Sequence, residues 1–382
     1  MTADIAPAVR FEALAAGYGD ALLVECATPG GPWRLLVDAG PRASWPVVRE
    51  RLARLPLSAA GRREIDLAIV SHVDHDHIGA FTDLLADTAL DLHFGDIWFN
   101  GREHLQWSTT PVTTRSPREG DALAKLLGAP GQPCPGNLAF EGGPVRTTGE
   151  GAWVEVPTVA GGPRLSLLSP TPLRLQSLAV EWDRALARSL RGDSEPDALE
   201  ETTRGGAFPD LQALADRPFK RDPSLPNGSS IAVLLEHLGV RLLLAADAYP
   251  NVIGSALRSL AQQRGQALPL PFDLFKLSHH GSRGNLMTPL LNILSADHYL
   301  ISTDNTRFKH PDDETLARLV LYGGLRPVLC FNHDTASNRR WDDPGMQAQY
   351  CYATVFPAPG TAGLRLDFPA FGSVADAGAM TR

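Results

Sequence analysis

Short apolar runs that alternate with amphipathic segments predict a mixture of strands and helices at the start of the chain. Residues 21–26 and 34–37 are largely apolar runs separated by Thr, Pro and Gly, which predicts a hairpin. Residues 43–57 carry apolar side chains at helical spacing and predict a helix. Residues 65–70 form a short, mostly apolar run between polar boundaries, which predicts a buried strand.

The same alternation continues through the rest of the chain. Further strands are predicted at residues 164–168, 231–235, 240–245, 272–277, 298–302 and 327–331. Further helices are predicted at residues 172–190, 208–215, 252–264 and 313–322. Residues 115–162 are rich in Gly, Pro and Thr and predict loops with short strands, and the tail after Phe368 is expected to fray. Strands that switch between hairpins and helix-flanked runs predict a layered α/β sandwich.

The composition narrows the class of protein. The chain has 382 residues, 43% of them hydrophobic, with a net charge of −8, which excludes a disordered or collagen-like chain. The acidic balance argues against nonspecific coating of nucleic acid or anionic membrane. Neither a signal peptide nor an apolar window of about 18 residues is present, so we expect a cytoplasmic protein without a membrane segment. The 4 Cys are scattered and form no CxxC, whereas five of the 11 His fall in two short clusters.

The sharpest chemical signal follows the predicted strand at residues 65–70. Residues 72–77 read HVDHDH, with three His and two Asp in six positions. Imidazole nitrogen and carboxylate oxygen are ligands for zinc and similar divalent ions. A turn at a strand end can direct several such side chains into one pocket, and closely spaced ligands can serve two ions about 3.5–4 Å apart. This density favours a metal site over an incidental polar loop.

His72, Asp74, Asp76 and His77, followed by Ile-Gly, form an HxDxDH pattern that resembles the metallo-β-lactamase superfamily signature, usually HxHxDH. With Asp74 in place of the usual His, the motif resembles that of the branch that contains the hydrolase domain of ComEC-type DNA-uptake proteins and the teichoic-acid phosphorylcholine esterases. Further motifs resemble that branch in chain order: GYGDA at 17–21, LVDAG at 36–40, NGSS at 227–230, LAAD at 244–247, KLSHHGS at 276–282 and an N-x4-HP at 305–311.

The resemblance implies a four-layer αββα sandwich with a metal pocket at one edge of its two central sheets. It implies that His72 and Asp74 hold one ion, that Asp76 and His77 hold the other, and that Asp247 bridges both. The ions would be two divalent cations, zinc with manganese as the alternative. Hydroxide held by the ions would then attack the substrate.

His279 and His280 would complete the two ligand sets. Adjacent residues of a strand point to opposite sides, so both can be ligands only if the backbone has already turned, which Gly281 allows. Otherwise one is a ligand and the other supports it, with His280 favoured. His75 falls at a variable position of the pattern and is expected to point away. Asn227 stands where common members carry a ligand His, so a mononuclear enzyme remains an alternative.

Substrate contacts are predicted around the second histidine cluster. Asp76, as a metal ligand, and His310 are the predicted catalytic residues, and His310 either contacts a phosphoryl oxygen, protonates the leaving group or caps the following helix. Ser282, Arg283 and Asn305 are expected to contact substrate oxygens.

The branch points to a phosphodiesterase or nuclease acting on an anionic phosphodiester, nucleic acid or nucleotide. The alternatives are a small ester, thioester or lactam hydrolase of the same fold and a non-catalytic metal-binding scaffold. We interpret residues 1–382 as one domain in which residues 171–226 form a helical insertion. That insertion either caps the pocket or forms a surface for a partner.

Overall fold

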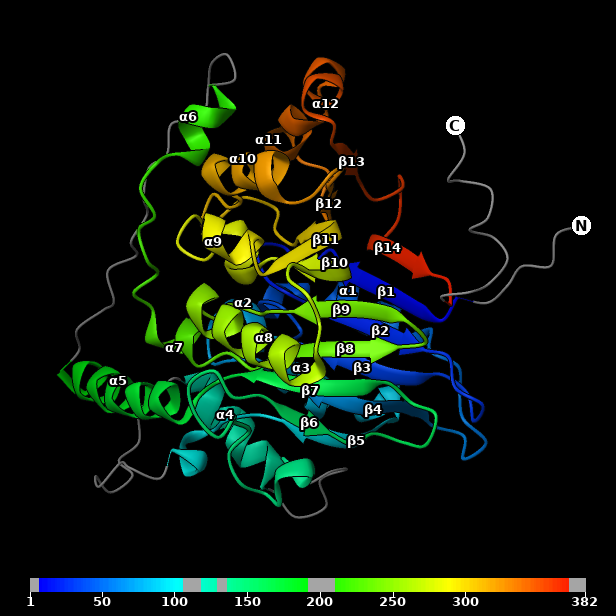
Figure 1. Cartoon of the computed structure of the whole chain (residues 1–382). Helices are drawn as coiled ribbons and strands as arrows, with labels where there is room; N and C mark the ends of the chain where they lie inside the picture. Colours follow the sequence, from blue (N-terminus) through cyan, green and yellow to red (C-terminus); the bar gives the residue numbers. More distant parts are fainter. Residues whose placement is uncertain (1–6, 106–117, 129–135, 192–209, 371–382) are drawn as a thin grey trace, which may run out of the picture.

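The computed structural model describes residues 7–105, 118–128, 136–191 and 210–370. Its strands form two sheets (Figure 1). The first sheet has the order β14-β1-β2-β3-β4-β5, with bounds Gly363–Phe368, Val9–Leu14, Leu22–Cys26, Trp33–Val37, Arg63–Ile69 and Leu92–Trp98. The second has the order β13-β12-β11-β10-β9-β8-β7-β6, with bounds Ala353–Val355, Val328–Phe331, Leu294–Ile301, Leu270–Lys276, Val240–Leu244, Ala232–His237, Arg164–Ser169 and Val154–Val156.

Apolar side chains from both sheets meet in one central core. Phe11 and Leu35 from the first sheet are fully buried together with Leu167, Leu242 and Leu274 from the second. This is the packing expected of two sheets that lie face to face. The central core therefore consists of the two inner sheet faces.

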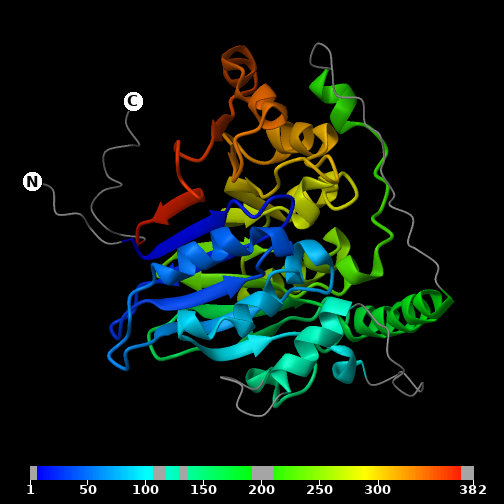
Figure 2. The same cartoon turned by 180° about the vertical axis from the view of Figure 1, so that it is seen from behind.

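Helices cover the outer face of each sheet (Figures 1 and 2). The first sheet is covered by α1, α2, α3, α4 and the start of α5, with bounds Trp45–Ala53, His75–Ile78, Phe81–Ala86, Arg118–Leu127 and Pro172–Arg191. The second is covered by α6, α8, α9 and α10, with bounds Leu211–Ala215, Pro250–Arg264, Thr288–Leu291 and Asp313–Tyr322. Three short helices complete the described α-helices, α7 Leu225–Gly228, α11 Ala336–Arg339 and α12 Pro344–Tyr350. The predicted four-layer αββα sandwich is thus confirmed.

Parallel pairing brings the loops of the histidine motifs to one edge. Strands β3, β4 and β5 run parallel, as do β9, β10, β11 and β12. The carboxyl ends of parallel strands share one edge of a sheet, which is where open α/β sheets form their ligand sites. The segments that follow β4, β9, β10 and β11 therefore converge.

Some predicted elements need correction. The expected loops at residues 115–162 contain a helix, α4, whose apolar side chains pack on the first sheet. No element was predicted at β1, β5, β14 or α12, because their apolar positions are few or interrupted by charges. The tail predicted to fray lies mostly outside the described residues, as does the centre of the predicted insertion at 171–226. In the described part of the chain, no helix combines the length and apolar character that a membrane crossing requires.

Candidate metal centre

Three strand-end segments bring their His and Asp side chains into one cluster. His72 and His77 follow β4, Asp247 follows β9, and His279 and His280 follow β10. The His72, His77 and Asp247 side chains are almost wholly buried, while His279 retains 21% and Asp74 38% of its side-chain exposure. The cluster is therefore sealed at its base and open on the side of Asp74 and His279.

One half of this cluster, which we call the inner set, contains four mutually close atoms. The Nε2 of His77 lies 3.4 Å from Oδ1 of Asp247 and 3.9 Å from Oδ2 of Asp76. The Nε2 of His280 lies 3.3 Å from the same Asp76 oxygen and 3.9 Å from the same Asp247 oxygen. Zinc bonds of about 2.0–2.1 Å in a tetrahedral site separate ligand atoms by roughly 3.3 Å. The inner set has the spacing of a preformed ligand shell.

The other half, the outer set, uses the second carboxylate oxygen of Asp247. That Oδ2 lies 3.8 Å from Nε2 of His72 and 4.0 Å from Nε2 of His279. The Nε2 of His72 is also 3.6 Å from Oδ2 of Asp74. Asp247 therefore presents one oxygen to each set, as a bridging carboxylate would.

Several of these atoms have no hydrogen-bond partner. The Nε2 atoms of His72, His77 and His280 and Oδ1 of Asp247 are buried without a hydrogen bond. Buried polar atoms are almost always satisfied, because an unpaired one costs about 1–3 kcal/mol. Nitrogen and carboxylate donors that converge unpaired fit divalent cations, so the residues present suit the metal that the sequence analysis predicted.

The opposite nitrogen of each ring is held in place. Nδ1 of His77 lies 2.8 Å from Oδ2 of Asp38, and Nδ1 of His280 lies 2.7 Å from the carbonyl oxygen of Ser302. Nδ1 of His279 lies 3.0 Å from Oδ1 of Asn285. Such contacts direct Nε2 toward a metal and set the ring orientation.

The paired histidines reach the same cluster because the strand has ended. Strand β10 stops at Lys276, and His279 and His280 both adopt left-handed backbone angles, with φ of 49° and 52°. Alternation along a strand therefore does not apply to them. Gly281 follows with φ of 89° and packs so closely on Pro311 that a Cβ there would collide. The structure brings both rings to the cluster.

Two other predicted positions lie around this cluster. His75 points to α4, where its Nδ1 lies 2.6 Å from Oε1 of Glu119. Asn227 lies beside the outer set, where its Nδ2 donates to Oδ2 of Asp222 at 2.9 Å and lies 3.3 Å from Nδ1 of His279. Asp222 thus supports the outer set from a segment to which the sequence analysis assigned no site residue.

The electrostatic state of the cluster follows from its close packing. Burial alone would raise the pKa of Asp247, but the imidazoles of His77, His279 and His280 hold that pKa well below its usual range. Burial alone would lower the pKa of His279, but Asp247 and Asp222 raise it to about 9. In the absence of a cation, the carboxylates are therefore charged and His279 holds a proton at neutral pH.

The predicted substrate residues divide into two groups. Ser282, Arg283 and His310 line a cavity of about 430 Å³ that opens onto Asp74, Asp76, Asp247 and His279. Asn305 does not line it; its amide donates to the His310 carbonyl and to Asn338, and its oxygen accepts from Thr335. Asn305 thus ties its own loop together.

His310 lies between the outer set and the cavity. Its ring centroid is 4.9 Å from that of His279, and its Nδ1 lies 3.5 Å from Oδ2 of Asp312. Burial lowers the pKa of His310, so the ring is neutral at pH 7. With Nδ1 facing a carboxylate, Nε2 is the nitrogen left to accept a proton. The roles predicted for His310, which are contact with a phosphoryl oxygen, protonation of the leaving group and capping of the following helix, stay predictions.

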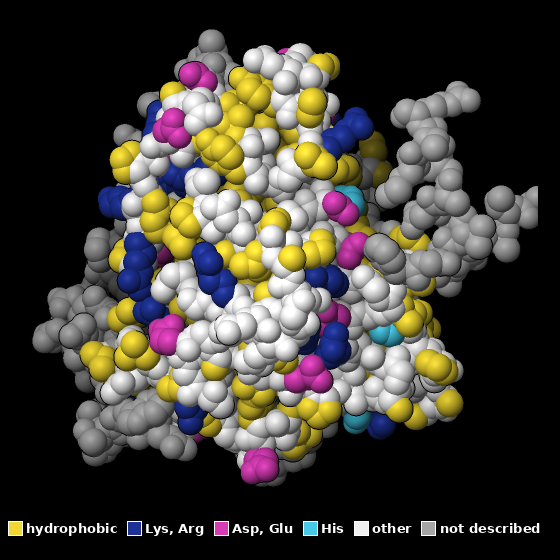
Figure 3. Space-filling model, viewed as in Figure 1, with side chains coloured by type: hydrophobic (Ala, Val, Ile, Leu, Met, Phe, Trp, Pro, Cys, Tyr) yellow, Lys and Arg dark blue, Asp and Glu magenta, His cyan; other side chains and the backbone are white. Residues whose placement is uncertain are grey.

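Basic side chains surround the same cavity. Lys220, Arg221, Arg283 and Arg307 contribute to its lining. Lys220 and Arg221 belong to the segment between α6 and α7, along which Lys and Arg side chains gather at the edge of the molecule (Figure 3). The metal cluster is thus bordered by positive charge on its open side.

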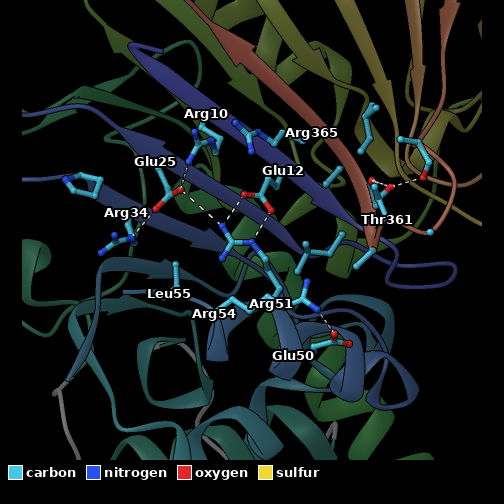
Figure 4. A pocket seen from close by; sticks show the side chains of 18 of the residues that line it. Arg10, Glu12, Glu25, Arg34, Glu50, Arg51, Arg54, Leu55, Thr361 and Arg365 are labelled. Carbon is cyan, nitrogen blue, oxygen red and sulfur yellow. Dashed lines mark hydrogen bonds and ion pairs between the residues drawn. The ribbon is translucent and has the colours of Figure 1, made fainter. Parts of the chain in front are cut away.

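A larger cavity of about 940 Å³ lies elsewhere, between α1 and strands β1, β2, β3 and β14, and we call it the charged groove (Figure 4). Arg51 donates to both oxygens of Glu12 at 2.6 Å, and Arg34 lies 2.8 Å from Glu25. No member of the metal cluster lines it. Size alone therefore does not identify the reactive site.

Comparisons with known proteins give a family match for part of the chain and similar solved structures. No curated protein matches the chain. Among solved structures, the metallo-beta-lactamase fold protein YhfI from Bacillus subtilis is similar at 12% identity, with 94% of this chain and 99% of that chain covered and a TM-score of 0.38. Residues 16–93, which contain the cluster at residues 72–77, match the Metallo-beta-lactamase superfamily, a superfamily of metal-dependent hydrolases.

Proposed function

We propose that this protein is a dinuclear, metal-dependent phosphodiesterase whose substrate is of nucleotide size. The observation that carries the proposal is the pair of ligand sets that share Asp247, placed at the base of a cavity with a basic border. A dinuclear site can stabilise both the attacking and the leaving oxygen of a displacement reaction. A basic border favours an anionic substrate over a neutral ester or lactam.

The inner set, from Asp76, His77, Asp247 and His280, would hold one ion, and the outer set, from His72, Asp74, Asp247 and His279, the other. Bound zinc or manganese would supply Lewis acidity and lower the pKa of water toward about 7. Asp247 would hold the two ions at a fixed separation, because one carboxylate faces both sets.

The protein's own side chains would position the phosphodiester. Arg283 and Lys220 can pair with its non-bridging oxygens from the cavity wall. His310 would accept a proton at Nε2, since its Nδ1 faces Asp312. These roles need no Ser or Cys nucleophile.

An aromatic group at the cavity supports a nucleotide as the substrate. The guanidinium of Arg307 lies 5.3 Å from the ring centroids of both Tyr18 and Phe308. Phe308 also lines the cavity and remains 41% exposed. Nucleobases stack on such rings with a gain of about 1–3 kcal/mol each. A cavity of about 430 Å³ suits a short substrate, so we favour nucleotide-sized diesters over long polymers.

The test is hydrolysis of bis(p-nitrophenyl) phosphate by the full chain with added Zn²⁺ or Mn²⁺, beside lactam and thioester reporters. Dinucleotides and linear single- and double-stranded DNA and RNA complete the panel. We expect diester hydrolysis that disappears on chelation and in the Asp76→Asn variant, with Asp367→Asn in the charged groove region as the matched control. Turnover confined to a lactam or thioester would refute the phosphodiester assignment.

A further inference from the structure

A lysine is buried directly behind the metal cluster. Lys276 ends β10 and has no exposed surface, although lysine is almost never fully buried without a partner. Its Nζ forms an ion pair with Asp20, donates to the carbonyl oxygen of Ala246 at 3.3 Å and lies 4.0 Å from Oδ1 of Asp247. A positive charge thus adjoins the oxygen that faces the inner set.

Asp20 reaches this position from the turn after β1. Its amide donates to the carbonyl oxygen of Asp76 at 3.1 Å, which fastens the turn to the metal loop. Its carboxylate oxygens lie 3.5 Å from Nδ1 of His280 and 3.8 Å from Nδ1 of His77. Those nitrogens lie on the ring sides opposite Nε2, so Asp20 stands behind the imidazoles of the inner set.

The pair therefore places one positive and one negative charge beside the inner set. Asp20 also forms, with His77, Asp247 and His280, a group whose possible ligand atoms all lie within 4.8 Å of one another. Oδ1 of Asp247 is 4.0 Å from the ammonium of Lys276 and 3.4 Å from Nε2 of His77. A cation in the inner set would contact the same Asp247 oxygen that lies 4.0 Å from Nζ of Lys276. The ammonium group of Lys276 would repel that cation. In a buried site this repulsion is only weakly screened.

We propose that Lys276 is a built-in counter-charge that sets the affinity of the inner set for a divalent cation and stabilises the buried carboxylates when no cation is bound. Asp20 holds the ammonium in place and offsets part of its charge. Both are positioning residues that act through Asp247, His77 and His280. The inference rests on the proposed metal centre, because it requires the inner set to bind an ion.

This role makes opposite predictions for the two partners. Lys276→Met removes a positive charge beside the site, so the inner set should bind a cation more tightly. Asp20→Asn removes a negative charge and leaves Lys276 facing Asp247, so binding should weaken. The double variant loses both charges and should return close to the parent. A purely structural ion pair would instead lower binding in both single variants.

The experiment is a competition titration of Zn²⁺ against a chromophoric chelator, using the full chain purified with Zn²⁺ and then depleted. We expect the dissociation constant of the tighter ion to fall about tenfold in Lys276→Met and to rise about tenfold in Asp20→Asn, since about 1.4 kcal/mol corresponds to a factor of ten. The double variant should lie within about threefold of the parent.

Thermal unfolding with and without chelator provides a second measurement. Removal of Zn²⁺ should lower the melting temperature further in Lys276→Met than in the parent, because the carboxylates then lack both cations. Arg318→Met is the matched control, since Arg318 is also buried but donates to backbone carbonyls at 2.8–3.2 Å away from the cluster. It should lose stability and keep its Zn²⁺ affinity.

Changes of the same sign in both single variants, or an unchanged affinity in Lys276→Met, would overturn the proposal. If metal-free Lys276→Met does not fold, the double variant decides, because it leaves no uncompensated charge: affinity near that of the parent supports the proposal, and affinity as weak as in Asp20→Asn overturns it. A parent chain that binds no Zn²⁺ or Mn²⁺ would refute the proposed metal centre itself, an outcome that differs from bound metal with insensitive variants.

Discussion

The metal cluster and the charged groove are both rich in charge, but they differ in how that charge is satisfied. In the groove each of its arginines faces a carboxylate, and the register places Asp367, Arg10, Glu25 and Arg34 in one row across β14, β1, β2 and β3. Figure 4 shows Arg10 and Arg34 directed at Glu25. In the cluster, several nitrogen and oxygen atoms are buried without a partner.

We interpret the paired charges of the groove as structural and the atoms without a hydrogen bond in the cluster as a ligand site. In the groove, cross-strand ion pairs neutralise one another and stabilise the sheet face modestly. The atoms without a hydrogen bond in the cluster lower the free energy of unfolding. A bound ligand that pairs with them would offset that cost. In this protein the convergence of such atoms marks the cluster, whereas single atoms without a hydrogen bond, such as Oγ of Ser169 and Nε2 of His333, also occur elsewhere.

The largest effect should come from the residue that the two ligand sets share. Asp247→Asn removes charge from both oxygens that face the sets, so kcat/KM for bis(p-nitrophenyl) phosphate should fall at least about 10³-fold. Steady-state kinetics and metal analysis of the purified variant measure this directly. If Asp247→Asn kept full activity and two bound ions, the carboxylate charge of Asp247 would not be required, and the cluster would no longer differ from the groove in its effect on activity.

Removal of metal should be the next largest effect and should involve the cluster alone. A ligand at 100 times its dissociation constant stabilises the folded state by about 2.7 kcal/mol. Chelation should therefore lower the melting temperature of the parent and of Arg51→Gln by the same interval. Calorimetry in matched buffers is the measurement, and an interval that shrinks in Arg51→Gln would show that the groove takes part in ion binding.

The metal-free cluster should also respond to pH. The folded-state pKa of His279 is about 9, raised above the ordinary value of 6.5 despite burial, because Asp247 and Asp222 favour the charged ring. Its stabilisation is fully present below pH 6.5 and is lost as the pH rises through about 9. Denaturant unfolding of metal-free protein across that window should show the decline, and His279→Gln should flatten it. An equal slope in parent and variant would assign the decline to another group.

The smallest effect should come from the groove. Arg51 is held in a two-pronged contact with Glu12, yet such partly exposed pairs contribute at most about 1 kcal/mol. Arg51→Gln should therefore lower stability by about that amount, less at high salt, with unchanged kcat/KM. Urea unfolding at two salt concentrations tests this. A loss of activity there would identify the groove as part of the site.

Local sequence patterns were sufficient to predict most of the strands and helices that form the two sheets and their covering layers. The apolar runs that became β2, β4, β8, β9 and β10 were short and sharply bounded, and α10 begins and ends at its predicted residues. Among the elements that were missed, strands β1, β5 and β14 mix apolar with polar or charged residues, because one face meets the core while part of the other is polar. Helix α4 was missed because its flanking residues are rich in Gly, Pro and Thr.

By itself, the sequence determined the donor types, the strand ends that carry them and the candidate residues of the cluster, because these depend on neighbours along the chain. Only the tertiary structure decided that His279 and His280 turn toward the same carboxylate, that the Asn305 amide ties its own loop, and that Lys276 and Asp20 pair behind the cluster. These outcomes depend on segments far apart in sequence. Their pairing is set by burial and charge in the folded protein, which no local pattern encodes.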